Sequence, residues 1–315
     1  MPKVSFILPA YKRRFLKEAI ASILAQTYKD LELVIVDDHS PEGLKDVVDQ
    51  FSDPRLTYYC NEENLGGKDL VAAWEKAMTY ARGEWCVLAS DDDLYHPEYL
   101  SEMLRLTEQY PQVNAVHSRV GIIDHEGRIT GFGQVRSPLE SAIEMVYSRS
   151  ICRYQQTMPD FMFRLEEFNR NGGFVKFPVA WYSDDATWAK LAKRGGVAFS
   201  PRVLFYFRYS GINISSTNSF VVEKMNAGYQ YCQWVLNFIK ELVPQSDEER
   251  RMIDIIQTRI EEQCLDLIRY IICPRLALRR FLPVLKKATI PSSWKKRIVK
   301  DRIARLLNIR TWLPF

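Results

Sequence analysis

The chain lacks any long run of apolar residues. Its apolar runs, such as Val4–Ala10 and Leu33–Val36, are far shorter than the roughly 20 residues that a membrane-spanning helix needs. The first run is followed at once by Lys12, Arg13 and Arg14, with no small-residue cleavage site after it, so we expect no signal peptide. These absences argue against an integral membrane protein and against a secreted precursor.

The cysteines are scattered, and their spacing carries no motif. The six cysteines, at positions 60, 86, 152, 232, 264 and 273, include no CxxC pair, which argues against a zinc site and a disulfide framework. Several lie among apolar neighbours, as in Trp85-Cys86-Val87, where a reduced thiol packs as a small core side chain. We therefore expect buried thiols of a reducing compartment.

The composition is that of an ordinary globular protein, but the charge is unevenly distributed. The 315 residues are 47% apolar and 26% charged, which suits one large or two small domains and excludes a disordered or low-complexity chain. The net charge of +4 hides a strongly basic end, because residues 274–315 carry twelve Lys or Arg and a single acid, Asp301. We expect this basic end to be a separate functional unit.

The first half alternates between apolar strand patterns and amphipathic helix patterns, which predicts βαβ units and a parallel sheet. The predicted strands are Val4–Leu8, Leu31–Val36, Leu56–Cys60 and Glu84–Ala89, and the helices between them are 15–27, Gly43–Phe51 and Asp69–Ala81. Next come a helix at Pro97–Gln109, strands at Ala115–Ile123 and Arg128–Phe132, irregular structure over 133–180, a helix at Thr187–Lys193 and a strand at Val203–Arg208. Beyond about 219 the pattern predicts four helices, at 222–242, 247–271, 275–287 and 292–308.

Polar residues follow three of the predicted strands, at the edge where an open parallel sheet binds its ligands. The first strand runs into Pro9–Tyr11, the second into Asp37–Asp38, and the fourth into Asp91–Asp93. A lone Asp at such a place is often a helix N-cap, and the triplet is alternatively a solvated loop that caps the helix at Pro97. Three adjacent carboxylates repel one another, however, and are favourable mainly around a cation such as Mg²⁺ or Mn²⁺.

These segments carry a resemblance to a known family. Six segments of the chain resemble the opening of the family 2 inverting glycosyltransferases, which have a GT-A fold. They are Pro9–Tyr11, Ser22–Tyr28, Glu32–Ser40, Asn64–Gly67, Ala81–Glu84 and Ser90–Pro97. Later blocks of that family are similar to Asn171–Phe174, Ser183–Asp185, Leu191–Gly195 and Tyr206–Arg208. The resemblance implies an α/β, Rossmann-like GT-A catalytic domain over residues 1–217, with a mainly parallel, doubly wound sheet. It gives no motif for residues 218–315, which we predict to be a helical C-terminal region.

The resemblance implies a site for a nucleotide-sugar donor. Asp38 would accept a hydrogen bond from the nucleotide base, which is usually uracil. The nucleoside pocket would be lined by Pro9, Ala10 and Tyr11. Lys68 stands where the family often places a basic residue near the base or the phosphates.

The resemblance also implies a site for Mn²⁺ or Mg²⁺. Asp92 matches the family's metal ligand, Asp93 would support the metal, and Asp91 would contact the ribose or the donor sugar. The family's usual form is Asp-x-Asp-Asp, and this sequence has Ser90 at the first position, which leaves the roles within the triplet open. We expect Asp91 or a bound water to compensate for the missing acid. A divalent cation would stabilise the charge that develops on a departing diphosphate.

An inverting transfer also needs a base that accepts the proton of the acceptor hydroxyl. The resemblance places this base in the Asp184-Asp185 pair. The spacing to Trp188 favours Asp184 and the order within the pair favours Asp185, so both stay candidates, and one of them is alternatively an N-cap. Trp181, Tyr182 and Trp188 are candidates for a sugar-stacking platform, or else ordinary core aromatics.

Arg208 and residues 209–215 lie where the family has a mobile loop near the diphosphate. This makes Arg208 a candidate ligand of the donor phosphates, and Gly211 would give the loop its flexibility. The alternative is a plain connecting loop.

The two basic helices at 275–287 and 292–308 mix Lys and Arg with apolar residues. One face of the second helix gathers Trp294, Ile298, Ile303, Leu306 and Leu307. Such a pattern suits a helix lying in an anionic membrane interface. The alternatives are a helical pair packed on the catalytic domain with a solvated basic face, and a dimer interface. No nucleic-acid-binding motif accompanies the charge, so we expect no nucleic-acid partner.

Together with these patterns, the resemblance implies a metal-dependent inverting glycosyltransferase. The expected donor is a UDP-hexose or UDP-N-acetylhexosamine, and the expected acceptor is a lipid-linked oligosaccharide, such as a glycan on a polyprenyl diphosphate in bacterial O-antigen or capsule synthesis. The expected location is cytoplasmic, peripheral on the inner face of the cell membrane. Two other classes stay open. One is a sugar nucleotidyltransferase, which would normally carry a glycine-rich phosphate loop that Tyr11–Arg14 lacks; the other is a catalytically silent membrane-bound scaffold.

Overall fold

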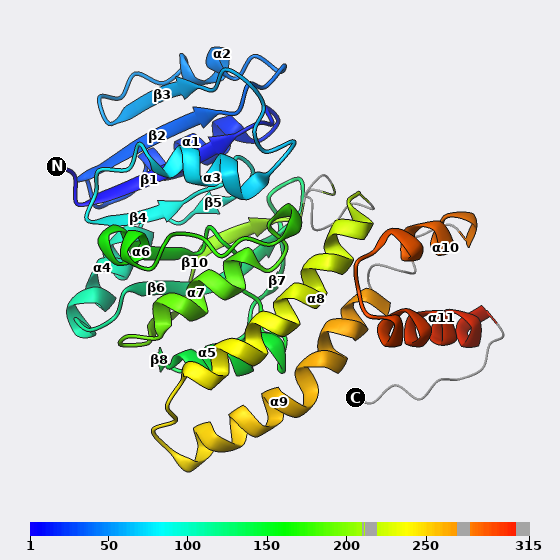
Figure 1. Ribbon diagram of the computed structural model, residues 1–315. Coiled ribbons are helices and arrows are strands. Elements are labelled where there is room, and N and C mark those ends of the chain that lie inside the picture. Colours follow the sequence, from blue (N-terminus) through cyan, green and yellow to red (C-terminus); the bar gives the residue numbers. More distant parts are fainter. Residues whose placement is uncertain (210, 212–218, 270–277, 307–315) are drawn as a thin grey trace.

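The computed structural model shows one mixed β-sheet with helices on both of its faces (Figure 1). It describes residues 1–209, 211, 219–269 and 278–306. Within these residues the strands are β1 (Val4–Ala10), β2 (Leu31–Asp37), β3 (Leu56–Cys60), β4 (Trp85–Leu88), β5 (Leu94–Tyr95), β6 (Ala115–Ile123), β7 (Ile129–Phe132), β8 (Leu139–Glu140), β9 (Phe161–Arg164) and β10 (Val197–Arg208). The order across the sheet is β3-β2-β1-β4-β9-β6-β10-β5, with β7 beside β6 and β8 beside β10.

The N-terminal half of the sheet is parallel. β1 pairs with β2 and with β4, and β2 pairs with β3, all in parallel register. β1, β2 and β4 are buried along nearly their whole length because helices cover both faces of the sheet, and this explains their almost continuous apolar sequences. The four strands predicted here are confirmed, and β1 runs on to Ala10 and β2 to Asp37.

The region 133–180, predicted to be irregular, contains regular structure. It holds β8, β9, helix α5 (Ala142–Ser150) and helix α6 (Leu165–Arg170). β9 pairs antiparallel with both β4 and β6, and it thereby joins the parallel half of the sheet to β6 and β10. The prediction was wrong here because these elements are short, and a four-residue run such as β9 has no periodicity that a sequence pattern can reveal.

Helices cover the two faces of the sheet and form two apolar cores. On one face lie α1 (Leu16–Leu24), α2 (Lys45–Val48) and α4 (Tyr99–Gln109); on the other lie α3 (Leu70–Met78), α5, α6 and α7 (Ser183–Ala192). This two-sided cover is the doubly wound α/β arrangement that the sequence predicted. Both α7 and β10 begin earlier than predicted, at Ser183 rather than Thr187 and at Val197 rather than Val203.

The C-terminal helices extend the core on the α3–α7 face. They are α8 (Val221–Phe238), the 3₁₀ turn η2 (Ile239–Glu241), α9 (Asp247–Leu267), α10 (Leu278–Lys287) and α11 (Ser292–Leu306). Each of the four α-helices contributes buried side chains to that one cluster: Cys232, Cys264, Leu285 and Trp294. The four predicted helices are confirmed within the described residues; 270–277, and residues 307–308 of the last predicted helix, lie outside them.

The apolar face predicted for α11 points into the protein. Trp294 and Ile298 are buried in the shared core, and Trp294 Nε1 donates a hydrogen bond to Glu261 Oε1 on α9 at 2.9 Å. The prediction that these two side chains face a membrane is therefore wrong, because they pack against the other helices. Ile303 is exposed, while the side chain of Leu306 and all of Leu307 lie outside the described part. Among the helices of the described residues, none is long and apolar enough to cross a membrane.

Candidate active site

The polar ends of β1, β2 and β4 meet at one edge of the sheet. Asp38 N donates to Ala10 O at 2.9 Å, which joins the ends of β2 and β1. Tyr11 N and Lys12 N donate to Asp91 Oδ2 at 2.8 and 2.7 Å, which joins the end of β1 to the segment after β4. The residues that the sequence singled out at these three strand ends therefore lie side by side.

Asp91, Asp92 and Asp93 form a buried acidic triplet. Asp93 Oδ1 accepts a hydrogen bond from Arg208 N at 2.8 Å, and Asp93 Oδ2 lies 2.5 Å from Ser90 Oγ. Ser90 Oγ also lies 3.3 Å from Asp92 Oδ1. The serine that stands at the family's first acidic position is thus a hydrogen-bond partner of the two later acids, a role that the sequence analysis did not assign to it.

Burial raises the pKa of all three carboxyls of the triplet. At Asp91, burial and the charge of Asp92 together raise the pKa to about 6. The same two causes raise the pKa of Asp93 well above its usual range. Burial also raises the pKa of Asp92, against the opposing charge of Lys12. Ionising these neighbouring carboxyls is therefore unfavourable unless a cation offsets their charge.

The chemistry of the triplet fits a hard divalent cation. Carboxylate oxygens are preferred ligands of Mg²⁺ and Mn²⁺, and such ions commonly bind through one or two carboxylates plus substrate phosphates. Asp92 is the residue that would hold the ion, with Asp91 and Asp93 on either side of it in the sequence. In the described part of the chain, no group of three or more His, Cys, Asp or Glu side chains is placed so that it could hold a metal ion, so a cation here would need ligands from the substrate in addition to the carboxylates.

Asp38 fixes a loop beside the end of β1. Its Oδ1 accepts hydrogen bonds from Asn61 Nδ2 at 2.8 Å and Leu65 N at 3.0 Å, and its Oδ2 accepts one from Gly66 N at 2.7 Å. A Cβ at position 66 would lie only 3.0 Å from Asp38 Oδ2, so a glycine permits this close approach. Asp38 therefore shapes the edge of the sheet next to Ala10.

Tyr11 and Lys68 lie on the solvent side of this edge. The Tyr11 side chain is exposed, and Ser40 Oγ donates to the Tyr11 carbonyl at 2.6 Å. Lys68 Nζ forms a surface ion pair with Glu63 Oε2 at 2.5 Å. Both side chains are accessible to a ligand, and their predicted roles toward a nucleotide stay predictions.

Arg208, at the end of β10, is buried beside the triplet. Its Nε donates to Asp92 O at 2.8 Å, and its Nη2 pairs with Glu18 Oε2 of α1 at 2.7 Å. Its guanidinium lies over the Phe15 ring, 4.3 Å from the centroid. These contacts tie the triplet to α1, and the predicted phosphate contact of Arg208 stays a prediction. Residues 210 and 212–215 of the predicted mobile loop lie outside the described residues.

A second carboxylate pair stands at the start of α7. Tyr182, the residue immediately before α7, has a left-handed backbone conformation with φ of 72°. Asp185 is buried, and its Oδ1 accepts hydrogen bonds from Arg149 Nε at 2.7 Å and Gln156 Nε2 at 2.8 Å. Asp184 is partly exposed, and burial together with the charge of Asp185 raises the pKa of Asp184 to about 8.

Strand register places Asp160, a neighbour of this pair, at the same end of the sheet as the triplet. Met162 of β9 pairs with Val87 of β4, so Asp160, two residues before Met162, lies level with the end of β4 that leads into the triplet. Asp184 is close enough to Asp160 for the charge of Asp160 to raise the pKa of Asp184. The two groups of carboxylates therefore share one end of the sheet.

The aromatic residues around α7 belong mostly to the core. Trp188 is fully buried and stacks on Phe161, with ring centroids 4.5 Å apart. Tyr182 stacks on Tyr231 of α8, with ring centroids 4.2 Å apart. The hypothesis of a sugar-stacking platform is therefore wrong for Trp188, whereas the partly exposed Trp181 stays a candidate.

Arg149 and Gln156 hold the buried acid of the pair, and the sequence analysis missed both. They precede Asp185 by 36 and 29 residues and lie in the region predicted to be irregular. The only signal in the sequence was an arginine within the apolar pattern of α5, which by itself identifies no partner. Only the fold shows that these two residues contact Asp185.

Comparison with known proteins agrees with the class that the sheet and its two carboxylate groups indicate. The model of the family described as "Glycosyl transferase family 2" matches residues 5–175, more than half of the chain. The chain belongs to this family.

Curated relatives match this chain over different shares of their length. The putative colanic acid biosynthesis glycosyl transferase WcaA of Escherichia coli (strain K12) is 37% identical over 111 residues, which are 34% of this chain and 39% of that protein. The GalNAc(5)-diNAcBac-PP-undecaprenol beta-1,3-glucosyltransferase of Campylobacter jejuni is 25% identical over 228 residues, which are 70% of each chain. WcaA and three other relatives are matched over only 30–46% of their own length.

Solved structures show the same fold. Residues 1–349 of TarS from S. aureus, in complex with UDP-GlcNAc, superpose with a TM-score of 0.66 at 16% identity, covering 98% of this chain and 89% of that one. The mannosyltransferase PcManGT from Pyrobaculum calidifontis, in complex with GDP-Man and Mn²⁺, gives a TM-score of 0.57 at 16% identity, covering 98% and 88%. At this level of identity the likeness establishes the fold alone.

Proposed function

We propose that this chain is a metal-dependent inverting glycosyltransferase that moves a hexose or N-acetylhexosamine from a UDP-sugar to a lipid-linked glycan. The observation that carries the proposal is that the Asp91–Asp93 triplet and the Asp184–Asp185 pair lie at one end of the sheet. The buried triplet around Asp92 suits a cation with a nucleotide diphosphate, and the partly exposed Asp184 suits a base. Membership in the glycosyl transferase family supports the reaction class.

Asp184 is the proposed base. The acceptor oxygen forms a bond to the anomeric carbon of the sugar while the bond from that carbon to the diphosphate oxygen breaks, so the configuration inverts. The hydroxyl proton passes to a carboxylate oxygen of Asp184, and the electron pair of the broken bond leaves with UDP. Asp184 is the better candidate of the pair because Asp185 is buried and engaged by Arg149 and Gln156. A cation held by Asp92 would supply positive charge to the departing diphosphate.

The donor and acceptor classes draw support from relatives. TarS has been solved with UDP and with UDP-GlcNAc, and the C. jejuni relative is named for an undecaprenol-PP-linked substrate. Asp38 and Tyr11, at the ends of β2 and β1, are the proposed contacts for the nucleoside, with Pro9 and Ala10 beside them and Lys68 toward the phosphates. A nucleotidyltransferase is disfavoured because the segment after β1 carries no glycine-rich loop.

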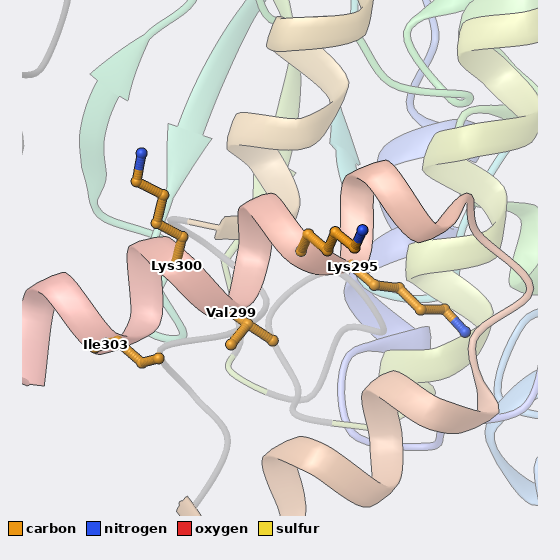
Figure 2. Close-up of a pocket in the computed structure, with 5 residues that line it drawn as sticks. Lys295, Val299, Lys300 and Ile303 are labelled. Carbon is orange, nitrogen blue, oxygen red and sulfur yellow. The ribbon is translucent and has the colours of Figure 1, made fainter.

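The proposal includes a peripheral site on the inner face of the membrane. An open hollow of about 460 Å³ on α11 is lined by Lys295, Lys296, Val299, Lys300 and Ile303 (Figure 2). Three lysines beside two aliphatic side chains suit anionic lipid headgroups with their first acyl carbons. The membrane contact proposed here is therefore this lysine hollow, and not the buried Trp294 face of the same helix.

Release of UDP tests the reaction and its base. Wild-type chain with Mn²⁺ is offered UDP-glucose, UDP-galactose, UDP-GlcNAc and UDP-GalNAc, with GDP-mannose for comparison and water as the acceptor. We expect turnover of at least one UDP-sugar and a loss of about 100-fold or more in Asp184→Asn, the usual contribution of a general base. The matched control is Asp247→Asn on the first turn of α9. Turnover of GDP-mannose alone, or an unchanged rate in Asp184→Asn, would contradict the proposal.

A further inference from the structure

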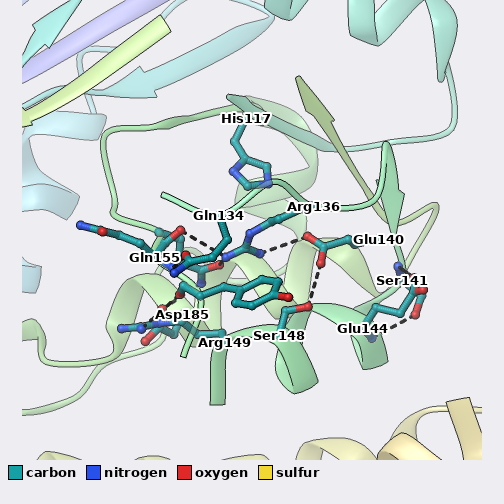
Figure 3. Close-up of polar contacts among 12 residues, drawn as sticks. His117, Gln134, Arg136, Glu140, Ser141, Glu144, Ser148, Arg149, Gln155 and Asp185 are labelled. Atoms are coloured by element: carbon teal, nitrogen blue, oxygen red, sulfur yellow. Dashed lines mark hydrogen bonds and ion pairs between the residues drawn. The ribbon is translucent and has the colours of Figure 1, made fainter. Parts of the chain in front are cut away.

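Asp185 belongs to a buried polar network behind the start of α7 (Figure 3). The residue is only 3% exposed, and its Oδ1 is held by Arg149 of α5 and by Gln156. Its Oδ2 is buried and, among the described residues, has no hydrogen-bond partner. The acid is therefore fixed from one side, by contacts that come from outside its own helix.

The network continues away from α7 through a second arginine. Arg136 Nη2 donates to Gln156 Oε1 at 3.1 Å, and Arg136 Nη1 pairs with Glu140 Oε2 at 3.0 Å. Ser148 Oγ of α5 donates to Glu140 Oε1 at 2.9 Å. Arg136 and Glu140 are both buried. The network thus contains two arginines and two carboxylates and ties α5, β8 and α7 together, which fixes the position of Asp185 more firmly than one ion pair would.

Asp184 lies directly beside this network. Asp185 N donates to Asp184 Oδ1 at 2.9 Å, so a shift of Asp185 moves the carboxyl of Asp184 as well. The charged and titratable groups that face the pair are Arg149 of α5, Asp160 before β9, Tyr182 before α7, Tyr231 of α8 and Cys264 of α9. Arg149 is the one cation among these groups. Its charge opposes those of Asp160 and Asp185 at Asp184.

We propose that Arg149 and Asp185 are positioning residues for glycosyl transfer, which fix the orientation and the charge environment of Asp184 without contacting the sugar. This inference rests on the proposed function, because it requires that Asp184 accepts the acceptor proton. Asp185 holds Asp184 through the backbone at the start of α7, and Arg149 holds Asp185 and offsets its charge. The geometry also separates the roles of two acids that the sequence alone left equivalent.

The pH profile of UDP release distinguishes positioning from a merely structural role. In Arg149→Met the cation is lost, so the pKa of Asp184 rises, and the acid limb of the pH profile of kcat moves to higher pH. If that pKa increases by about one, kcat at pH 7 falls about tenfold. In Asp185→Asn a neighbouring anion is lost, so the acid limb moves to lower pH. Arg149→Lys keeps the positive charge, so its acid limb should lie close to the pH at which that of the wild type lies. We expect KM for the UDP-sugar to stay within about twofold in all three.

Arg105→Met is the matched control, because Arg105 pairs with Glu102 on α4, on the opposite face of the sheet. Shifts of the acid limb in opposite directions in Arg149→Met and Asp185→Asn support the inference. If the acid limb stays at the wild-type pH in both variants while kcat is lowered, the inference is wrong. If Arg149→Met fails to fold, judged by circular dichroism, then Asp185→Asn and Arg149→Lys decide in the same way.

A second readout separates this inference from the proposed function. Carboxyl ¹³C titration of aspartate-labelled protein follows Asp184 without turnover, with Asp184→Asn to assign its signal. If the Asp184 titration moves in opposite directions in the two variants while no UDP-sugar is turned over, the network acts on Asp184 as inferred and the reaction proposed is wrong. If UDP-sugars are turned over, Asp184→Asn is inactive and the titration does not move, the inference alone is wrong.

Discussion

At the scale of single residues, ionisation of Asp184 is unfavourable, because its carboxyl is partly buried and lies beside Asp185. Its pKa is raised from an ordinary value of 3.8 to about 8, so between these values the folded protein holds a proton that the unfolded chain has lost. The free energy of unfolding therefore falls as the pH rises through this window, and the stabilising proton is lost by about pH 8. Groups with strongly raised pKa values are found most often at functional sites, which agrees with the role proposed for Asp184.

The Asp184→Asn variant should lack this pH dependence, because asparagine does not titrate. We expect its melting temperature to equal that of the wild type near pH 4 and to exceed it by about 2 °C or more at pH 8 to 9. Differential scanning calorimetry across that pH range measures the difference. A variant that is less stable than the wild type by the same amount at every pH would show that Asp184 is a structural cap and carries no raised pKa.

Sequence patterns identified single residues well where they follow apolar strands. Asp38 and Asp91–Asp93 lie at the predicted edge, because the ends of parallel strands meet by construction. Ser90, Arg149 and Gln156 were assigned no role, because their partners depend on packing across elements. The resemblance could not decide between Asp184 and Asp185 either, and it is burial that separates them.

At the scale of helices and strands, α8 supports the segment that leads into α7. Tyr231 of α8 stacks on Tyr182, and its hydroxyl lies 2.8 Å from Ser150 Oγ at the end of α5. Tyr182 has a positive φ, an unfavourable conformation for a bulky residue, so its place must be fixed by packing. The stack on Tyr231 provides that packing immediately before Asp184.

Replacing Tyr231 by leucine should therefore disturb catalysis as well as stability. We expect Tyr231→Leu to lower kcat for UDP release about tenfold and the free energy of unfolding by about 2–3 kcal/mol, through loss of buried aromatic contacts. Tyr231→Phe keeps the ring stack and loses only the hydrogen bond, so it should cost about 1 kcal/mol and leave kcat nearly unchanged. Urea unfolding and UDP release measure the two effects. Equal kcat in all three proteins would mean that α8 has no part in placing the α7 segment.

Long elements were predictable and short ones were not. β1, β2, α8 and α9 have seven or more residues with a strong apolar pattern, and each was found with its bounds within a few residues. β9 and α5 are short or weakly patterned, yet β9 joins the two halves of the sheet and α5 supplies Arg149. The weakest sequence signal therefore fell on the elements that set the geometry of Asp184 and Asp185.

At the scale of the whole molecule, the C-terminal helices share one apolar core with the catalytic sheet. Cys232 of α8, Cys264 of α9 and Trp294 of α11 belong to the same cluster as side chains of α3 and α7. The division at residue 217 stays a prediction from composition and motifs. Because the helices pack on the sheet, a membrane contact is better tested by changing surface charge than by removing residues 274–315.

Charge reversal on α11 tests the membrane proposal. Lys295, Lys296 and Lys300 are changed together to glutamate, and flotation is measured with phosphatidylcholine vesicles with and without phosphatidylglycerol. Since each lysine near an anionic surface contributes about 1 kcal/mol, the variant should lose about 100-fold in partitioning to the anionic vesicles. Glutamate at Lys17, Lys45 and Lys76 is the matched control. Equal flotation of both triple variants would place the membrane contact elsewhere or exclude it.

The most direct test of the proposed donor site is calorimetric titration of UDP into the intact protein, with and without Mn²⁺, and into Asp92→Ala. We predict tight UDP binding that requires both Mn²⁺ and Asp92, because the carboxylates of the triplet need a cation and a diphosphate provides its remaining ligands. UDP binding that is unchanged without Mn²⁺ or in Asp92→Ala, or absent under all conditions, would contradict a metal-dependent UDP-sugar site at the end of β4.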